Sequence, residues 1–324
     1  MKVVRRDILK AAAGAALFAG MPNSSRAAGY PDRPVHMVIG YPPGLQPDVI
    51  ARLVASGLSA ELGQPVVVDN RPGAGTNLGT QIVIKAPADG YSILFLSVTT
   101  VAANASLYPE LNFNFLHDIE PVANVCSYPL VLAANPSLPV KTLPDLIAYA
   151  KANPGKLNMA SAGVGTAPHL FGELFNMMAG IKLVHVPYRG NFIPDLLGGQ
   201  VQVAFGGISV FAPHFKSGKL LGLGVTSAKR SPALPDLPAI AEAVPGYEAI
   251  GWYGIGAPKG TPADIVAALN SKIDAAIAKP DLKMRLGALG FDSEPMAPAA
   301  FGALLAAETK KWAKVIKFAG IKAE

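Results

Sequence analysis

The sequence predicts an α/β protein in which two sets of alternating strands and helices form two lobes. Two observations support this class. Short runs of β-branched residues alternate with helical patterns between residues 35 and 97, and the alternation starts again at residue 131. The 33 glycines and 29 prolines are spread along the chain, as expected for many tight connections between short elements. Because 51% of the residues are hydrophobic and only 15% are charged, the chain has ample apolar material for a packed core.

Residues 1–27 are predicted to be an export signal. Residues 4–10 read VRRDILK, a twin-arginine pattern, and an apolar run follows at 11–20. This run is too short for a transmembrane helix, which needs roughly 20 apolar residues. Small side chains at Ser25 and Ala27 provide a cleavage site. We therefore expect cleavage near Ala27 and a mature chain in the periplasm, with the pattern favouring the twin-arginine route.

Removing this segment changes the charge of the protein. The whole chain has 28 basic and 22 acidic residues, a net charge of +6, and residues 1–27 hold five of the basic residues and one of the acidic residues. The mature chain keeps 23 basic and 21 acidic residues, a net charge of +2. This balance, without a dense basic patch, argues against nucleic-acid binding. No later run of 18 apolar residues occurs, so we expect a soluble mature protein.

The first alternation reads as a β-α-β-α-β unit. Glycine and proline clusters separate its elements, beginning with the turn Gly40-Tyr41-Pro42-Pro43-Gly44. Such a unit predicts a parallel sheet flanked by helices. The strands are expected at 35–39, 66–68 and 91–97, and the helices at 48–62 and 76–85.

The second alternation has the same character, with Thr142 as an expected helix N-cap. An extended surface loop is predicted at 229–238, and from Pro262 the chain is expected to form at least three helices that pack back on the first lobe. The chain would then cross between lobes near 127–130 and 226–228, as in hinged two-lobe proteins. The predicted limits are 28–128 plus 229–324 for lobe 1, and 129–228 for lobe 2. The strands are expected at 131–134, 157–160, 183–186, 201–205 and 221–226, and the helices at 142–153, at 168–180 and before Gly198.

A glycine-rich turn at residues 73–79 raises the question of a nucleotide cofactor. Gly73-x-Gly75-x-x-x-Gly79 follows a strand and opens a helix, but its spacing differs from G-x-G-x-x-G. The next strand ends in Ser97, where an acid that binds ribose would be expected. We interpret the glycines as a turn that lets a helix pack closely, and we predict no cofactor.

Ser161 lies in a partial nucleophile elbow that lacks the first glycine. His169 and His185 are the candidate bases of a serine hydrolase. A hydrolase also needs a carboxylate that orients the base, and no spacing singles one out. Catalysis by Ser161 is therefore the weaker alternative, and we expect that the protein is not an enzyme.

The remaining candidate chemistry is metal binding or thiol chemistry. None of the five histidines pairs with another ligand residue at metal-binding spacing, so no metal site is predicted. His36 and His185 lie on predicted strands and are expected in the core or between the lobes. The only cysteine, Cys126, cannot form an internal disulfide and is expected to be a small buried residue.

Three strand ends lead through turns rich in Gly, Ser and Thr into helix N-termini, at 41–48, 160–166 and 188–191. Free backbone N–H groups and the helix dipole bind anions at such termini. In open α/β sheets the binding crevice lies at the carboxyl ends of the strands. The turns therefore fit the capture of a small acid, although ordinary βα turns have the same composition.

Longer motifs show a resemblance to a known family. LGQPVVVDNRPGAG at 62–75, ADGY at 88–91, GTAPHL at 165–170 and HVPYRG at 185–190 resemble the Bug family of periplasmic solute-binding proteins, the receptors of tripartite tricarboxylate transporters. YPDRP at 30–34, LLGGQ at 196–200 and WYG at 252–254 extend the resemblance over nearly the whole mature chain.

The resemblance implies two Rossmann-like lobes joined by a hinge, as in type II periplasmic binding proteins, which close on a ligand carboxylate held largely by backbone amides and water. It implies a monomeric receptor that delivers the ligand to membrane transporter subunits. A periplasmic partner of a sensor kinase is an open alternative. Asp48 is expected to cap a helix or to orient water or a ligand amine. The predicted ligand-binding residues are Tyr41, Gly44, Leu45, Asp48, Ser97, Ser161, Gly163, Thr166, His169, Tyr188, Gly190 and Asn191.

The chain departs from the family pattern at two places. Leu45 stands where the family usually has a second glycine, which predicts a narrower or more apolar pocket and disfavours a positive φ there. The stretch from Gly190 to Asp195 is about two residues shorter than usual, so Phe192 is expected to reach the site. Both departures favour a hydrophobic or aromatic carboxylate over citrate or aspartate.

Overall fold

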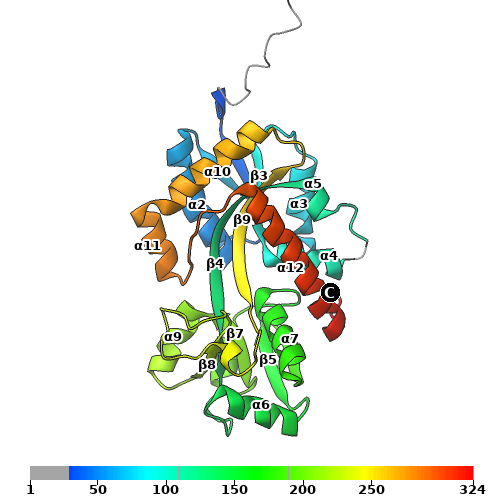
Figure 1. Cartoon of the computed structure of the whole chain (residues 1–324), viewed down its shortest axis with the longest axis vertical. Helices are drawn as coiled ribbons and strands as arrows, with labels where there is room; N and C mark the ends of the chain where they lie inside the picture. The colour runs from blue at the N-terminus through cyan, green and yellow to red at the C-terminus, as the bar shows by residue number, and fades with distance from the viewer. Residues whose placement is uncertain (1–28, 109, 189, 324) are drawn as a thin grey trace, which may run out of the picture.

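A computed structural model describes residues 29–108, 110–188 and 190–323. The predicted export signal and its cleavage at Ala27 lie outside these residues. Figure 1 shows an elongated molecule with two α/β lobes stacked along its long axis: lobe 1 at the top and lobe 2 at the bottom. Two long strands, β4 (Ile119–Ala134) and β9 (Ile250–Pro258), run along the middle and join the lobes.

The sheet of lobe 1 confirms the predicted β-α-β-α-β unit. Strand β1 (Val35–Ile39) pairs in parallel with β2 (Val66–Asn70) and β3 (Ser92–Ser97), and β9 lies antiparallel between β3 and β4. The whole strand order is β2-β1-β3-β9-β4-β7-β5-β6, with β8 also paired to β4. The helices associated with lobe 1 are α2 (Gln46–Leu62), α3 (Asn77–Ile84), α4 (Asn104–Leu107), α5 (Phe115–Asp118), α10 (Ala263–Ala278), α11 (Pro280–Ala288) and α12 (Pro298–Ala319).

Lobe 2 repeats the parallel arrangement on a smaller sheet. Strand β5 (Leu157–Ser161) pairs in parallel with β6 (Leu183–Pro187) and β7 (Val203–Gly207). Strands β7 and β8 (Leu221–Val225) pair antiparallel with the second half of β4. Thr142 caps α6 as predicted, in a capping box with Asp145. The helices are α6 (Leu143–Ala152), α7 (Ala167–Ala179), α8 (Ile193–Leu197) and α9 (Ile208–Lys216).

Strand β4 changes its pairing partner close to the predicted first crossing at 127–130. β4 pairs with β9 as far as Pro129 and with β7 from Leu130 onward. The second crossing comes later than the predicted 226–228. Ala239 still bridges to Val225 of β8, and pairing with lobe 1 begins only at Ile250. Because apolar residues between 231 and 249 pack on β8, these contacts favour placing residues 229–249 with lobe 2.

Helix α12 connects the lobes a third time. It packs on β4 in lobe 1 and runs down to α7 in lobe 2 (Figure 1). The rings of Trp312 and Phe171 are stacked at this contact, 5.3 Å apart and 10° from parallel. The expected C-terminal helices are therefore present, and the last of them touches both lobes. Within the described residues, no helix is both long enough and apolar enough to cross a membrane.

The core corrects one prediction and agrees with two others. His36 is exposed, and its side chain leaves β1 on the face opposite to Val35 and Met37, which are fully buried. Cys126 on β4 is fully buried, as expected. A β-carbon on Gly79 would lie 3.2 Å from the Arg71 carbonyl oxygen, so the glycine-rich turn does let α3 pack closely.

Candidate functional site

The loop between β1 and α2 is held by the carboxylate of Asp48. Its Oδ2 accepts hydrogen bonds from the Gly44 N–H at 2.9 Å and from Arg52 Nε at 3.0 Å. Its Oδ1 accepts one from Asn70 Nδ2 at 2.9 Å and forms an ion pair with Arg52 Nη2 at 3.0 Å. Burial alone would raise the pKa of Asp48, but these bonds outweigh it and hold the pKa below its usual value. Both carboxylate oxygens are committed to the loop, so Asp48 acts as a structural clamp.

Leu45 takes the N-cap position of α2 without strain. The positive φ that the turn requires, +83°, falls on Gly44, whereas Leu45 is extended with φ −76°. The Leu45 side chain is 50% exposed. The leucine therefore fits the backbone of this loop and adds an exposed apolar side chain to its surface.

Tyr41 and Ser97 lie together in a chain of hydroxyl groups. Tyr41 Oη is 2.7 Å from Ser97 Oγ, and Ser97 Oγ is 3.1 Å from Thr100 Oγ1. Thr76 continues the chain by donating to Thr100 at 3.2 Å. Burial raises the pKa of the Tyr41 hydroxyl, so this group is a neutral hydrogen-bonding partner.

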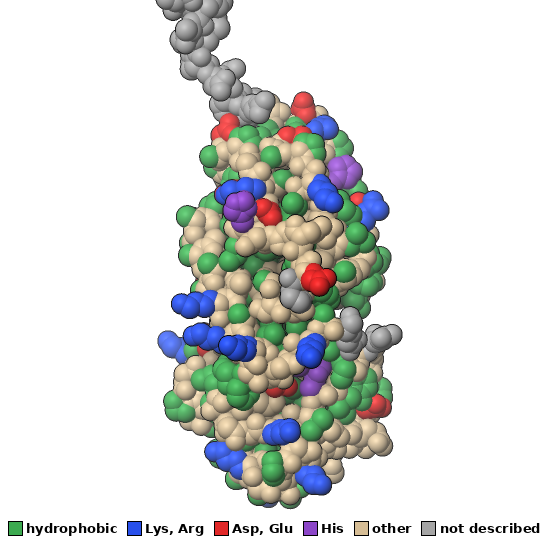
Figure 2. All heavy atoms as spheres, turned by 90° about the vertical axis from the view of Figure 1, so that its right-hand side faces the viewer, with side chains coloured by type: hydrophobic (Ala, Val, Ile, Leu, Met, Phe, Trp, Pro, Cys, Tyr) green, Lys and Arg blue, Asp and Glu red, His purple; other side chains and the backbone are tan. Residues whose placement is uncertain are grey.

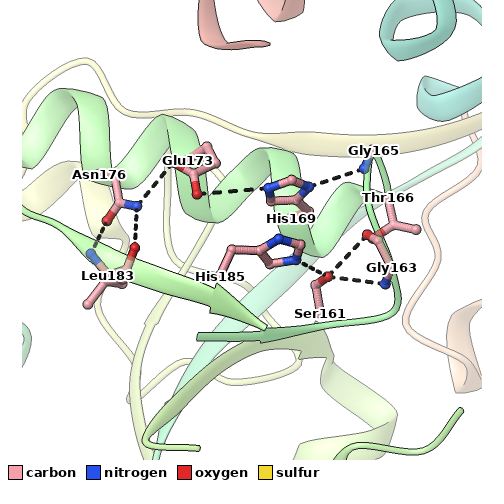
Figure 3. A network of polar contacts seen from close by, with 9 residues as sticks. All are labelled: Ser161, Gly163, Gly165, Thr166, His169, Glu173, Asn176, Leu183 and His185. Carbon is pink, nitrogen blue, oxygen red and sulfur yellow. Dashed lines mark hydrogen bonds and ion pairs between the residues drawn. The ribbon is translucent and has the colours of Figure 1, made fainter. Parts of the chain in front are cut away.

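The loop between β5 and α7 is held by His169. The Gly165 N–H donates to Nδ1 of His169, four residues later, at 3.1 Å. Gly165 has a positive φ of +75°. Thr166 Oγ1 donates to the Gly163 carbonyl at 2.7 Å and thereby closes the turn before α7. His169 is 3% exposed. Figure 3 shows its ring between this turn and Glu173, whose Oε1 lies 3.8 Å from Nε2.

Ser161 and His185 form a pair but not a complete catalytic triad. Ser161 Oγ is 2.6 Å from His185 Nε2 and also bonds to the Gly163 backbone, and the serine is fully buried (Figure 3). The acid in this network, Glu173, lies beside His169. His169 stacks on His185 instead of bonding to Ser161. Within the described residues no carboxylate is bonded to His185, so the group that a hydrolase needs to orient its base is missing.

The third loop, between β6 and α8, is more exposed. The Tyr188 hydroxyl donates to Asp195 Oδ2 at 2.7 Å, and the Tyr188 N–H donates to the Ser161 carbonyl at 3.0 Å. Gly190 and Asn191 are exposed, and Asn191 Oδ1 accepts from the Ile193 N–H at the start of α8. The Phe192 ring packs between Tyr188 and Phe211, which commits it to the aromatic cluster of lobe 2.

The lobes touch directly beside the second loop. Thr99 Oγ1, from the turn after β3, donates to the Gly165 carbonyl at 3.1 Å. A β-carbon on Gly165 would also overlap the Leu107 side chain of lobe 1. The predicted turn at 160–166 is thus linked to lobe 1 through Thr99. Gly165 belongs to that predicted turn, whereas Thr99 was not predicted, although it follows Ser97 at a third strand end and could have been found there.

A cavity of about 580 Å³ opens behind the paired histidines, lined by both lobes. Its polar lining comes from His169, Glu173, Asn176, Lys182 and His185 in lobe 2 and from Lys322, and the end of α12 closes its other side. Figure 2 views the side of the molecule with α7 and the end of α12 and shows a histidine and an acidic side chain at the lower surface, bordered by basic ones. Across residues 29–323 as described, no group of three His, Cys, Asp or Glu side chains could hold a metal ion.

Comparison with known proteins agrees with this architecture. A family model described as the tripartite tricarboxylate transporter family receptor matches residues 50–321. The chain is 38% identical over 316 residues to the UPF0065 protein in the tcbD-tcbE intergenic region of Pseudomonas sp. strain P51, which covers 96% of this chain and 94% of that protein. It is 37% identical over 308 residues to Protein BugT of Bordetella pertussis, with 94% of each chain covered.

Solved structures share the fold. The R. palustris protein Rpa4515 with adipate has a TM-score of 0.79 and 36% identity, with 90% of this chain and 99% of that chain covered. MatC of Rhodopseudomonas palustris with bound malate has a TM-score of 0.76 and 31% identity, with 89% and 100% covered. The periplasmic binding protein BugD has a TM-score of 0.76 and 35% identity, with 91% and 100% covered. These likenesses confirm the predicted two-lobe, type II-like fold and the resemblance to Bug proteins. The chain belongs to the tripartite tricarboxylate transporter receptor family.

Proposed function

We propose that the mature chain is a periplasmic receptor that captures a small carboxylate between its lobes and delivers it to a transporter of the tripartite tricarboxylate type. The observation that carries the proposal is the first turn of α7. Among the described residues, the backbone N–H groups of Ala167 and His169 have no hydrogen-bond acceptor. They lie next to the glycine turn at 163–165, which contacts lobe 1 through Thr99. Such N–H groups bind carboxylates, and the adipate and malate in two structural neighbours are both dicarboxylates.

Calorimetry with a panel of acids tests the capture of a carboxylate. Adipate, malate, citrate and benzoate are titrated into the mature protein, and the dimethyl ester of adipate is the matched uncharged control. We expect saturable binding of at least one acid and none of the ester. Ligand at 100 times its Kd adds about 2.7 kcal/mol to the free energy of unfolding, which a thermal shift detects. Equal binding of acid and ester, or no binding of any carboxylate, would reject the proposal.

The ligand is proposed to have an apolar body. Leu45 supports this, because it presents a half-exposed aliphatic side chain beside Gly44. The same titrations decide the point. Tight citrate binding without benzoate binding would exclude an apolar ligand. In that case a Leu45→Gly variant should have nearly the same affinity for citrate as the parent protein.

Delivery to a transporter is separable from signalling. In cells that lack the receptor gene, uptake of the labelled ligand should fall and should return when the gene is restored. Intact ligand binding with unchanged uptake would favour the sensor-kinase role.

Two further properties are proposed and tested separately. If the chain is exported by the twin-arginine route, replacing both Arg5 and Arg6 with lysine should block its export. The molecular mass of the mature protein in solution, measured by light scattering, should be that of a monomer.

We further propose that the receptor has no hydrolase activity. The complete burial of Ser161 and the separation of Glu173 from His185 support this. Incubation with a panel of esters should give no product above that of a Ser161→Ala control. Turnover that the control abolishes would establish an enzyme.

A further inference from the structure

The cavity behind the paired histidines has two walls of different character. One wall comes from α7 and β6 and carries polar side chains, among them Glu173 and Asn176. The other wall comes from the end of α12 and the residues after it, and Phe318, Ala319 and Ile321 make it apolar. The volume of about 580 Å³ lies within the range of about 300–1,000 Å³ that small-molecule sites occupy. A molecule in this cavity would therefore contact polar groups on one side and apolar groups on the other.

Glu173 is a buried carboxyl group with one oxygen that lacks a hydrogen bond. It lies in the middle of α7 and is 9% exposed. Asn176 Nδ2 donates to its Oε2 at 3.1 Å. Among the described residues, Oε1 accepts no hydrogen bond, and its contact with His169 Nε2 is 3.8 Å long, beyond hydrogen-bond reach (Figure 3). Because burial of a carboxylate is costly without a partner, Oε1 lacks the donor that it needs.

The neighbours of Glu173 do not neutralise its charge. His169 accepts the Gly165 N–H at Nδ1, which a ring nitrogen does only when it carries no proton, so this ring is uncharged. The Asn176 amide is also uncharged, and it is held in place by bonds to both backbone groups of Leu183. Burial raises the pKa of Glu173, as expected for a carboxyl group without a cation beside it. The carboxyl group is therefore oriented in advance and open to a cationic partner.

We propose that this cavity is a second ligand site, separate from the cleft between the lobes, which binds a small amphipathic amine with its ammonium group on Glu173 Oε1 and its apolar body against Phe318 and Ile321. The ammonium group supplies both the missing donor and the missing positive charge. The apolar body covers Phe318, which is 58% exposed, and Val184, which is 38% exposed. A hydrated metal ion would leave this apolar wall uncovered, so an organic cation fits the cavity better.

Two lysines at the rim raise the alternative of an anionic ligand. Lys182 and Lys322 line the cavity, are exposed and form no ion pair within the described residues. Exposed ammonium groups are hydrated and screened by salt, so they gain little from an anion and repel a cation only weakly. The buried carboxyl group of Glu173 gains more from a partner of opposite charge, because water screens it less. Glu173 therefore determines the sign of the ligand charge.

Calorimetry with phenethylamine tests the site. The matched control is 2-phenylethanol, in which a hydroxyl group replaces the ammonium group on the same apolar body. We expect saturable binding of phenethylamine and binding of 2-phenylethanol that is weaker by roughly 10-fold or more. Neither compound carries a carboxylate, so the capture of an acid between the lobes does not contribute to the signal.

Four variants of the mature chain identify the contacts. Glu173→Gln removes the charge, can still accept from Asn176, and should weaken phenethylamine binding by roughly 10-fold or more. Its matched control is Glu248→Gln, at an exposed position that does not line the cavity, which should bind like the parent protein. Phe318→Ala removes part of the apolar wall and should weaken binding by roughly 3- to 10-fold. Lys322→Gln should bind phenethylamine as well as the parent protein or slightly more tightly.

Each opposite result would overturn the proposal. It fails if phenethylamine does not bind saturably or if 2-phenylethanol binds equally well. It also fails if Glu173→Gln and Phe318→Ala keep the parent affinity, because the amine would then bind elsewhere. A loss of affinity in Lys322→Gln would contradict a site for a cation. Because neither compound is an acid, these results are independent of carboxylate capture, and the failure of one proposal leaves the other standing.

Discussion

The imidazole rings of His169 and His185 are stacked, with their centroids 3.5 Å apart and their planes within 7°. Two protonated rings at this distance would repel strongly. Burial lowers the pKa of His169 to about 3, and the neighbouring His185 adds to the shift. Burial also lowers the pKa of His185 to about 4. The stack between α7 and β6 is therefore a neutral structure.

This neutrality predicts acid sensitivity. Because the folded-state pKa of His169 lies below its unfolded value of about 6.5, the unfolded chain binds the proton first. The contribution of the neutral His169 ring to the free energy of unfolding is complete above pH 6.5. It decreases as the pH falls and is smaller by about 3 kcal/mol at pH 4. Urea unfolding at pH 7 and pH 4 should show a smaller loss in His169→Asn than in the parent protein.

The comparison of variants isolates His169 from its neighbours. Glu173, with its raised pKa, changes stability in the opposite direction over acid pH, and Lys182 and Lys322 line the same cavity. All three remain in the Asn variant. Parallel losses in the two proteins would show that His169 is already protonated in the folded state.

Asp48 should be essential for the stability of lobe 1. Asp48→Ala leaves Gly44, Arg52 and Asn70 without their shared acceptor, and Asp48 is 3% exposed. We expect a loss of about 2–4 kcal/mol in the free energy of unfolding. The control is Asp281→Ala, which removes an exposed i,i+4 pair at 3.8 Å and should cost less than about 0.5 kcal/mol. Equal losses would contradict the clamp.

Gly254 on β9 should not tolerate a methyl group. A β-carbon there would overlap the Phe301 ring and approach the Ala123 carbonyl oxygen to 2.9 Å. Gly254→Ala should destabilise the protein by about 1–3 kcal/mol in thermal or urea unfolding. Gly287→Ala in α11 meets no atom within 4 Å and should stabilise by up to about 1 kcal/mol. A neutral Gly254→Ala would mean that β9 and α12 separate easily.

Trp312 should carry much of the contact between α12 and lobe 2. It is fully buried, stacks on Phe171 and donates from Nε1 to Glu308 at 2.6 Å. Trp312→Ala should cost about 3–5 kcal/mol in urea unfolding. Phe318→Ala on the same helix, where the ring is 58% exposed, is the matched control and should change stability by less than about 1 kcal/mol. Similar losses in the two variants would contradict a special role for Trp312.

The sequence was sufficient for elements with ordinary local signals. Gly63 ends helix α2, and the β-branched run after Pro65 forms strand β2 at Val66–Asn70, as the glycine and proline positions predict. Strand β9 was not predicted, because three of its nine residues are glycines, which have low strand propensity. Those glycines are required by contacts with Tyr128, Phe301 and Ile119, which no local pattern contains. β4 was recognised only at its end, since Pro121 and Pro129 interrupt its pattern.

The candidate site was predictable in its loops but not in its bonds. Gly44, Asp48, Ser161 and His169 were predicted as ligand-binding residues from the resemblance to Bug proteins. The bond from the Gly165 N–H to His169 depends on a positive φ and a side-chain rotamer, and neither is encoded by spacing. The pairing of Ser161 with His185 joins residues 24 positions apart through the register of β5 and β6, which only the folded sheet determines.

The burial of Cys126 makes this receptor a ready sensor scaffold. The thiol is fully inaccessible, and burial raises its pKa far above that of a free cysteine. The folded protein should therefore ignore maleimide reagents. A single cysteine introduced at half-exposed Leu45 would be the one labelled position, so a dye placed there would report ligand capture optically without any background from the native thiol.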